Sequence, residues 1–394
     1  MKKTLLLFVV LTFVYSCSSV KQTQKALNTG NYDQAIAVAL KKLRANKAKK
    51  GNQPHILILE EAYAKVVERD VNAVNYMEQE ANPANLERIY NMYRTLKKRQ
   101  ESIKPLLPLY VNEQARNAVF KMEDYDQRIL ATKEKLSQYL YDKANTALIN
   151  ASVKTDYRQV YNDLIHLDKI NPNYRNTKSL IEEAHFKGTD FVIVTMQNRT
   201  NMVIPRRLES DLLNFNTYGL NDLWTVYHSA REPNITYDYA MNIALREINI
   251  SPEKITERQL QRERTVKDGW KYLLDENGKI VVDDEGKKVK VDKMVKVLCE
   301  YYEFTQFKAV NVAGNVRYRN LSTNRVLKTF PIASENVFEH IYATYDGDKR
   351  ALEEDLVRFL GMQAVDFPSN EQMVYDTGED LKLKIKRIIT NYSF

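Results

Sequence analysis

The chain has 394 residues, 44% of them hydrophobic and 28% charged, and its formal net charge is +8. This composition excludes a disordered or fibrous chain, and the length allows two or three domains at about 150 residues each. The 59 basic and 51 acidic residues are interspersed, whereas a nucleic-acid-binding protein gathers its positive charge on one face. We therefore expect no nucleic-acid partner.

The first sixteen residues have the pattern of a secretory signal peptide. Lys2 and Lys3 precede residues 5–14, which are apolar except for Thr12, and Ser16 supplies the small residue before a cleavage site. This apolar core is too short to span a bilayer, which takes roughly 20 residues. We expect residues 1–16 to be removed from the mature protein.

The sequence Val14-Tyr15-Ser16-Cys17 resembles the lipobox of bacterial lipoproteins. The resemblance implies that Cys17 is acylated and becomes the mature N-terminus. Several acyl chains, at about 0.8 kcal/mol for each buried methylene, would hold the protein at a membrane. An ordinary signal peptide or short anchor with an incidental cysteine is the alternative.

Residues 18–22 bear on which membrane this would be. They contain neither the acidic run of some surface-exported lipoproteins nor the aspartate that marks inner-membrane retention. The resemblance therefore implies the outer membrane, with the protein facing the periplasm.

The second cysteine, Cys299, has no partner once Cys17 carries lipid. We expect no internal disulfide, although such bonds are common outside the cytoplasm. Cys299 falls on the apolar face of an alternating segment, residues 295–301. The position favours a small buried hydrophobe over a reactive thiol.

Residues 17–187 are predicted to form a helical domain. Residues 28–36, with Gly30, Tyr32 and Ala35, resemble the junction inside a tetratricopeptide repeat, and residues 157–184 form a second such stretch around Asn171-Pro172. The resemblance implies a helical-hairpin array of roughly four to seven helices with a concave surface for other proteins. Apolar residues at helical spacing support this: Ile36, Leu40 and Leu43, then Leu86, Tyr90, Tyr93 and Leu96.

Within the helical domain, the run from Lys41 to Lys50 contains six basic residues and no acidic one. Near a lipidated terminus it would add attraction to anionic headgroups at about 1 kcal/mol per basic residue. A solvated helix end explains it as well.

Residues 188–394 are predicted to form a strand-rich domain. A helix is expected at 205–215. In the helical domain before it, Asn171-Pro172 is expected to end one helix and begin the next. Strands are expected at 191–194, 237–245, 295–301 and 310–318, with a hairpin turn at 322–325 leading into a strand at 326–332.

Two helices are expected to close the chain. Asp348 is placed to cap one that carries Leu352 and Leu356, and Thr377 with Asp380 has the spacing of a capping box for the last. Helices on one side of an antiparallel sheet make an α+β fold, the class we expect for the whole chain.

The strand-rich domain also contains a predicted projecting β-meander at about 268–293. Two similar turns stand eight residues apart, each with a glycine corner suited to positive φ. Their acidic residues do not match the alternating ligands of a calcium loop. A decorative insertion is the simpler interpretation of the meander. The functional hypothesis is a solvent-exposed tongue that contacts a partner through Asp275, Asn277, Gly278, Asp283 and Gly286.

The strand order, the hairpin at 307–332 and the terminal helix resemble the periplasmic α/β domain of curli-secretion and penicillin-binding-protein-activator lipoproteins. The resemblance covers about 150 residues on pattern alone. It implies a role in envelope assembly and transfers no site residue.

Patterns for catalysis are absent from the sequence. It has no phosphate-binding glycine loop, no serine elbow and no metal-spaced pair among its five histidines, His55, His166, His185, His228 and His340. Asp346-Gly347-Asp348 could be a metal-binding pair, but a turn before a capped helix explains it more simply. We expect no catalytic residue, no metal and no cofactor.

The sequence therefore favours a lipid-anchored envelope protein that acts as a scaffold or accessory subunit. The alternative is a module that binds cell-wall or surface glycan through the strand-rich half, where some of the 25 tyrosines would stack on sugars. An enzyme acting on envelope polymers is the third hypothesis.

Overall fold

The computed structural model describes residues 19–394. The expected signal peptide and Cys17 lie outside the described residues. The chain divides into two compact units, one ending at Gly188 and the other spanning Thr189–Phe394. The first is built of helices and the second of a sheet with helices against it, which confirms the α+β class.

The helical unit contains seven α-helices, counted over residues 19–188. Residues 19–28 form the first. The others are α2 (Tyr32–Ala45), α3 (Gln53–Glu80), α4 (Leu86–Ile103), α5 (Asp126–Asn150), α6 (Lys154–Ile170) and α7 (Thr177–Gly188). The segments between them contain four short 3-10 turns and two small strands: η1 (Lys50–Asn52), η2 (Pro83–Asn85), η3 (Lys104–Leu106), η4 (Asn112–Gln114), β1 (Tyr110–Val111) and β2 (Arg116–Asn117).

The turn before α2 has the expected features. Gly30 adopts φ 77°, and the Asn31 side chain accepts a hydrogen bond from the backbone N–H of Gln34. Ala35 is fully buried and Tyr32 packs against the same cluster. A glycine with positive φ followed by an asparagine N-cap ends one helix and begins the next.

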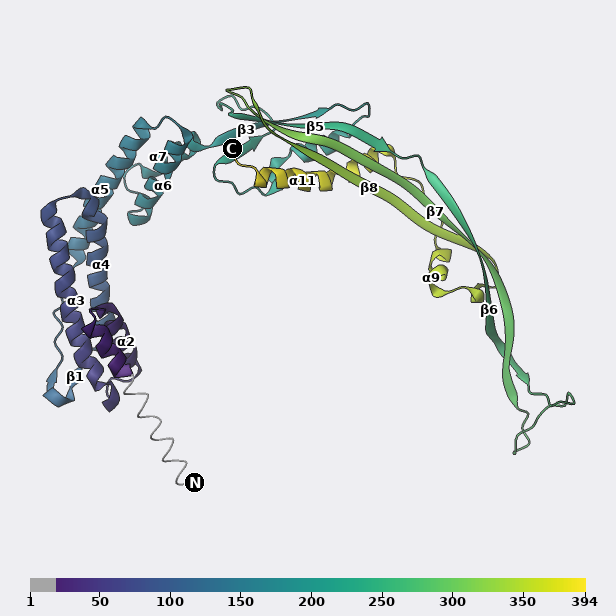
Figure 1. Ribbon diagram of the computed structural model, residues 1–394, viewed down its shortest axis with the longest axis horizontal. Helices are drawn as coiled ribbons and strands as arrows, with labels where there is room; N and C mark the ends of the chain where they lie inside the picture. Colours follow the sequence, from purple (N-terminus) through teal and green to yellow (C-terminus); the bar gives the residue numbers. More distant parts are fainter. Residues whose placement is uncertain (1–18) are drawn as a thin grey trace. The chain divides into compact units, whose positions relative to one another are not determined.

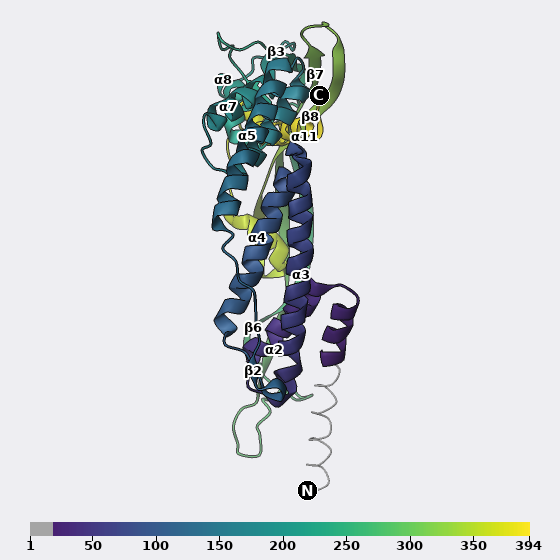
Figure 2. The same ribbon diagram turned by 90° about the vertical axis from the view of Figure 1, so that its left-hand side faces the viewer.

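Helix α5 is shared by two apolar clusters of the helical unit. Its first turns lie near Tyr125, which packs with Tyr93 of α4. Its last turns bury Ala144 and Leu148 against α6 and α7. Figure 2 shows α3 and α4 side by side, with α5 following α4. One long helix thus connects the two halves of the array.

The expectation that Asn171-Pro172 ends one helix and begins the next was partly wrong. Helix α6 ends at Ile170, but α7 begins only at Thr177. Asn173 and Arg175 have positive φ, a conformation that a helix excludes. Tyr174 between them is buried and hydrogen-bonds to Glu134 of α5, so tertiary packing determines this turn.

The second unit contains a six-stranded sheet. Its strands are β3 (Asp190–Asn198), β4 (Thr225–His228), β5 (Tyr239–Ile250), β6 (Lys254–Tyr272), β7 (Lys290–Asn320) and β8 (Val326–Gly347). The order is β4-β3-β5-β7-β6, with β8 also paired to β7. Its helical elements are α8 (Arg206–Leu213), η5 (Phe215–Tyr218), η6 (Lys349–Ala351), α9 (Glu354–Val357), η7 (Arg358–Gly361), α10 (Asn370–Asp376) and α11 (Gly378–Asn391).

The sheet is mixed, which corrects the expectation of a purely antiparallel one. Strand β3 runs parallel to both β4 and β5, and the other pairs are antiparallel. The chain between β3 and β4 includes α8, and a crossover of this kind returns the chain in the same direction. The expected hairpin between β7 and β8 is confirmed.

Strand β7 is 31 residues long and organises the rest of the unit. Along one edge it pairs first with β6 and then with β5, and along the other with β8. Its pairing with β8 stops at Cys299, so the last part is a two-stranded β6–β7 hairpin. Figure 1 shows this curved ribbon, with α9 and α11 on its concave side.

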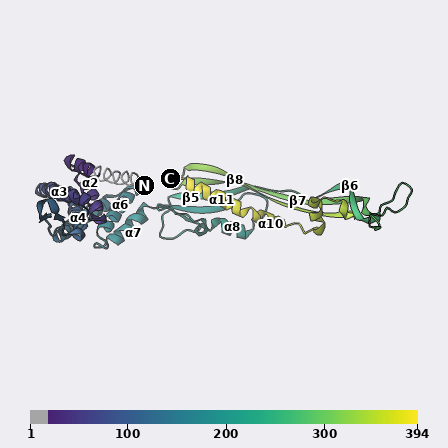
Figure 3. The same ribbon diagram turned by 90° about the horizontal axis from the view of Figure 1, so that it is seen from below.

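Two apolar clusters pack against different stretches of the ribbon. Val310 and Val312 belong to the main core with α8, α10 and α11 (Figure 3), whereas Cys299 and Tyr301 pack with Leu352 near α9. The β7–β8 register is unbroken between these positions, and residues of odd and even number point to opposite faces of a strand. The buried side of β7 therefore changes from odd-numbered to even-numbered residues along the strand as the ribbon twists, and α9 and α11 both lie on the concave side of the ribbon, as expected.

An extended segment between Gly361 and Ser369 connects the elements of the two clusters. The amide of Gln306 donates to the carbonyl of Val365 at 2.8 Å and accepts from its N–H at 3.0 Å. The buried ammonium of Lys308 donates to the carbonyl of Pro368 at 2.7 Å. Side chains of β7 thus replace a paired strand in holding this extended segment.

Both predicted helix caps need correction. Asp348 accepts from the backbone N–H of Arg350 at 3.0 Å, but the helix it was expected to begin is broken into η6, α9 and η7. Thr377 follows α10 directly, and its hydroxyl donates back to the carbonyl of Val374 at 2.8 Å. Because the hydroxyl bonds to α10, a helix that the sequence pattern did not predict, it does not form the expected capping box with Asp380.

Candidate functional site

The β6–β7 hairpin ends in a three-armed structure, residues 270–293, which we call the head. Two small hairpins project between the ends of β6 and β7, each closed by one bridge, Leu274 with Ile280 and Val282 with Lys288. The ribbon itself is the third arm and ends at the pair Tyr272 and Lys290. The head occupies the position of the predicted meander, at the end of the ribbon beyond β6 in Figure 1.

Three residues spaced by eight join the arms through a closed ring of backbone hydrogen bonds. The N–H of Leu273 donates to the carbonyl of Val289 at 2.9 Å, that of Val281 to Leu273 at 2.9 Å, and that of Val289 to Val281 at 3.0 Å. Backbone groups at a junction need partners, and this ring supplies them without a further strand. The head is therefore an ordered junction and not a loose loop.

The predicted contact residues of the two small arms build their turns. The Asp275 carboxylate accepts the N–H groups of Asn277 and Lys279 at 3.0 and 2.9 Å. Asp283 accepts those of Glu285 and Lys287 at 3.1 and 2.8 Å. Asp side chains commonly stabilise turns in this way. The structure thus places both aspartates inside the arms' own frameworks.

The two glycine corners have the conformation that the sequence predicted. Gly278 has φ 78° and Gly286 has φ 79°, in the left-handed region that glycine adopts without a steric penalty. The acidic side chains of Glu276 and Asp284 stand exposed between each aspartate and its glycine. The outer surface of each arm is therefore an acidic corner.

The sequence analysis missed the apolar face of the head. Trp270, Leu274, Ile280 and Val282 are 49, 55, 40 and 55% exposed. Alternation along the strands places Trp270, Leu274 and their cross-strand partners on the face opposite the Leu273, Val281 and Val289 side chains. The eight-residue spacing of those three junction residues was the signal in the sequence that would have revealed the arrangement.

Lysine side chains lie over the aromatic rings of this face. The Lys290 ammonium lies 3.7 Å from the centroid of the Trp270 ring, and the Lys288 ammonium 5.4 Å from that of Tyr272. The Trp270 and Tyr272 rings meet edge to face at 5.0 Å. A cation over an aromatic face is attracted by the negative side of its quadrupole. The ribbon arm is therefore positive, in contrast to the acidic corners.

The base of the head is fixed by an ion-pair network. Asp268 accepts from Arg350 at 3.1 Å and from Lys293 at 3.4 Å. The hydrogen bonds from Arg350 and Lys293 lower the pKa of the Asp268 carboxyl. Next to it Gly269 adopts φ 81° at a register shift in the β6–β7 pairing. This contact joins the ribbon to the segment before α9.

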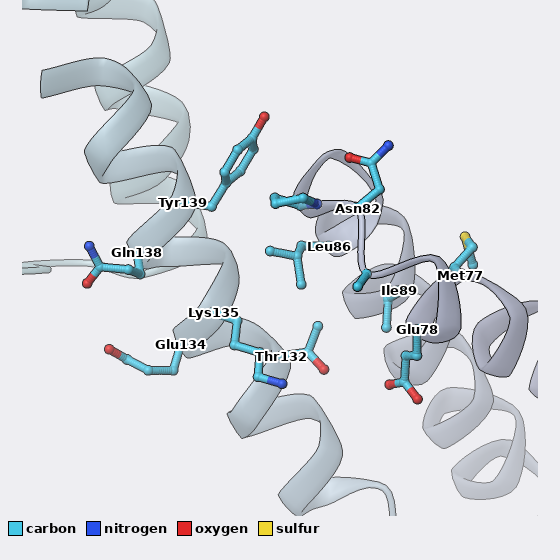
Figure 4. Close-up of a pocket in the computed structure, with 12 residues that line it drawn as sticks. Met77, Glu78, Asn82, Leu86, Ile89, Thr132, Glu134, Lys135, Gln138 and Tyr139 are labelled. Carbon is cyan, nitrogen blue, oxygen red and sulfur yellow. The ribbon is translucent and has the colours of Figure 1, made fainter. Parts of the chain in front are cut away.

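A groove in the helical unit is a second candidate surface, which the sequence did not predict. It lies between the α3–α4 turn and α5, with a volume of about 820 Å³. Figure 4 shows Leu86 on the α3–α4 side of the groove and Thr132 and Tyr139 on the α5 side. An apolar floor with polar groups at its margin is typical of a site that receives another molecule.

Polar residues at the margin of the groove are held by neighbouring helices. Glu78 accepts a hydrogen bond from the Tyr93 hydroxyl at 2.9 Å, and Glu134 accepts one from Tyr174 at 3.1 Å. Because these carboxylates are oriented from outside the groove, their positions do not depend on an occupant. The groove is thus preformed.

The histidines lie apart from one another. His166 contacts Glu87 at 3.1 Å, His228 the Tyr237 hydroxyl at 2.9 Å, and His340 the carbonyl of Gln363 at 2.8 Å. His55 is fully buried, and neither ring nitrogen has a hydrogen-bond partner among the residues that the structure describes. His185 belongs to α7.

Over residues 19–394, no group of three or more histidine, cysteine, aspartate or glutamate side chains is placed to hold a metal ion. Cys299 is fully buried, as expected, and burial raises the pKa of its thiol. Asp348 binds Arg350 and orders the turn after β8. Cys299 is thus a buried core residue, and Asp348 has a structural role in the turn.

Comparison with known proteins finds no matching family model and no matching curated protein. In the described part of the chain, no helix combines the length and apolar character that a membrane crossing requires. The structure by itself thus defines the class: a two-unit α+β protein with a helical array and a long β-ribbon that ends in a three-armed head.

Proposed function

We propose that the protein is a non-catalytic scaffold or accessory subunit of a cell-envelope assembly, attached to the outer membrane by acyl groups on Cys17 and facing the periplasm. The observation that carries this proposal is the head, an ordered junction with exposed Trp270, Leu274 and Val282. Exposed apolar centres with charged margins are typical of protein contact surfaces.

The arrangement of the head supports protein binding in particular. Protein interfaces depend on a few aromatic and aliphatic anchors surrounded by polar residues that exclude water. Trp270 and its apolar neighbours form such a centre, and Glu276 and Asp284 stand at its margin. The ring of backbone hydrogen bonds holds the centre in place before binding, which lowers the entropy cost of ordering it.

The groove of the helical unit supports the same proposal with a second contact surface. One wall is formed by α5 and the other by the ends of α3 and α4 with the turn between them, and sites built on helices are more precise than sites on loops. A scaffold needs at least two sites to hold other molecules together. We assign the groove to a different envelope protein from the one at the head.

A purification experiment tests the scaffold proposal. The tagged full chain is extracted in detergent, and the recovered proteins are identified and quantified. We expect a stoichiometric envelope protein, and about tenfold less of it from a chain with Leu86→Gln and Tyr139→Ala, which remove anchors from the groove. Ile149→Gln on α5, where the side chain is 75% exposed, is the matched control. Recovery of the tagged chain alone would contradict the proposal.

The lipid anchor has its own test. The wild-type chain should enter the detergent phase on phase partition, and its N-terminal peptide should carry acyl mass on Cys17. Cys17→Ser should move the protein to the aqueous phase because no acyl chain remains to hold it. A wild-type chain that stays in the aqueous phase would remove the anchor from the account.

A glycan-binding module is the second candidate. The exposed Trp270 beside the half-buried Tyr272 favours it, since aromatic faces stack on sugar rings. Lys290 already lies over the Trp270 ring, so a sugar would have to displace it or use the other face. Sedimentation of the purified protein with peptidoglycan tests this candidate. Loss of sedimentation in Trp270→Ala would support it.

A further inference from the structure

We infer that the head binds the head of a second copy of this chain. The inference rests on the proposed function, in which the head is a protein-binding surface, and it names the partner. Residues 270–293 contain six lysines and six acidic residues. Two such heads therefore carry no net charge to repel each other, and each bears both signs.

The two signs are unevenly divided between the arms. Residues 274–280 and 282–288 contain five acidic residues against three lysines, whereas residues 270–272 and 290–293 contain three lysines against one aspartate. Glu276 and Asp284 stand at the corners of the small arms, whereas Lys288 and Lys290 lie over the aromatic rings beside the ribbon arm. A two-fold axis brings the same surface of both copies together, so each contact occurs twice. A small arm of one head placed on the ribbon arm of the other pairs acid with base in both copies.

The apolar centre fits the same partner. Leu274, Ile280 and Val282 are 40 to 55% exposed on one face of the junction. One apolar β-surface can pack against another of its kind, because β-structures stack face to face at about 10 Å. Face-to-face contact covers the apolar centres of both heads at once and leaves the ion pairs at the margin.

Other occupants fit less well. An anionic bilayer surface would attract Lys288 and Lys290 but repel the five carboxylates of the two corners, Asp275, Glu276, Asp283, Asp284 and Glu285. A partner of one charge sign would face the same conflict on one arm or the other. A second head carries both signs of charge, so each arm can meet an arm of opposite sign.

Two differently tagged full-length copies, co-expressed and extracted in detergent, test the inference. Purification through one tag should recover the other copy. Leu274→Ser with Val282→Ser should reduce this recovery about tenfold, because the apolar centre is lost. Val203→Ser is the matched control, since Val203 is 88% exposed in the same unit. Full recovery with the apolar centre removed would overturn the inference.

A charge exchange makes the test specific to two-fold pairing. One variant carries Glu276→Lys and Asp284→Lys, and the other carries Lys288→Glu and Lys290→Glu. Each variant alone places like charges in contact, so copies of one variant should recover about tenfold less of each other. The two variants mixed restore opposite charges at every contact and should recover each other as the wild type does.

The outcomes separate this inference from the proposed function. No recovery of the second tag from the wild type, or no restoration in the mixed pair, would overturn the inference. The stoichiometric envelope protein bound through the groove tests the scaffold proposal independently. If the wild-type head recovers a different protein in place of the second copy, the head is a protein-binding surface with another partner, and only the inference falls.

Discussion

Arg99 of α4 donates a hydrogen bond to Asp70 of α3 at 2.6 Å, and both side chains are more than nine-tenths buried. The same guanidinium binds Asp33 of α2 at 2.8 Å. One cation thus joins three helices of the array. A buried carboxylate that loses its cation costs more than the pair itself contributes.

Replacing Arg99 should therefore be severely destabilising. We expect Arg99→Met to lower the free energy of unfolding by about 3 kcal/mol, because the buried Asp70 carboxylate keeps only the half-exposed Arg69, at 2.9 Å, as a cationic partner. The double variant Arg99→Met with Asp70→Leu should recover much of this loss. Urea denaturation measures both. Lys65→Ala, which removes an exposed pair with Glu61, should change stability by less than about 1 kcal/mol.

Glycine at position 314 is required by a close approach of two strands. A Cβ atom there would lie 2.3 Å from the carbonyl oxygen of Ala244, beside the register shift in β5. Gly314→Ala should destabilise the sheet unit by about 1 to 3 kcal/mol, the usual range for overpacking. At Gly361 a Cβ meets nothing within 4 Å. Equal melting temperatures for the two alanine variants would contradict this reading of the strand contact.

Stability should fall in mild acid because of His55. Burial, and then the nearby charge of Lys42, lower the pKa of this imidazole below 6.5. His55 therefore takes up a proton more readily in the unfolded chain than in the folded chain, and the folded state loses stability as pH falls below 6.5. Each unit of pKa depression costs about 1.4 kcal/mol once the pH is below the folded-state value.

The comparison of His55→Leu with the wild type measures this effect. Melting temperatures recorded between pH 7.5 and 5.0 should fall less steeply in His55→Leu. Val203→Ser, which changes an exposed side chain without a titratable group, should keep the wild-type slope. Parallel curves for all three proteins would show that His55 does not cause the acid sensitivity.

The C-terminal residues clamp the sheet unit through stacked aromatic rings. Phe394 stacks on Tyr239 with ring centroids 3.8 Å apart, and Tyr392 on Tyr318 at 4.6 Å. Removing residues 392–394 should cost about 2 to 4 kcal/mol, since aromatic pairs add to the loss of buried area. Ser393→Ala should be neutral. An unchanged denaturant midpoint after truncation would show that the tail only rests on the surface.

Local patterns predicted much of the fold. The α+β class, the β7–β8 hairpin, the burial of Cys299 and the positive φ of Gly278 and Gly286 all followed from spacing and residue type. Each depends on a few neighbouring residues. The same reasoning failed at Thr377, because a helix that ends directly before it had already engaged the hydroxyl.

The features that were missed depend on contacts between distant residues. The parallel pairing of β3 with β5 requires the chain to pass through α8 and β4 first. The ring formed by Leu273, Val281 and Val289 requires three segments to meet. The sequence therefore identified Asp275 and Asp283, which build the turns, and missed Trp270 and the apolar face.

Site-specific photo-crosslinking in living cells tests the scaffold proposal most directly. A photoreactive amino acid is placed at Tyr139 in the groove, at Leu274 on the head, and at the exposed control positions Ile149 and Val203. The account predicts a discrete crosslinked envelope protein from position 139, a dimer of this chain from position 274, and neither from the controls. Chains that remain uncrosslinked at both 139 and 274 would contradict it.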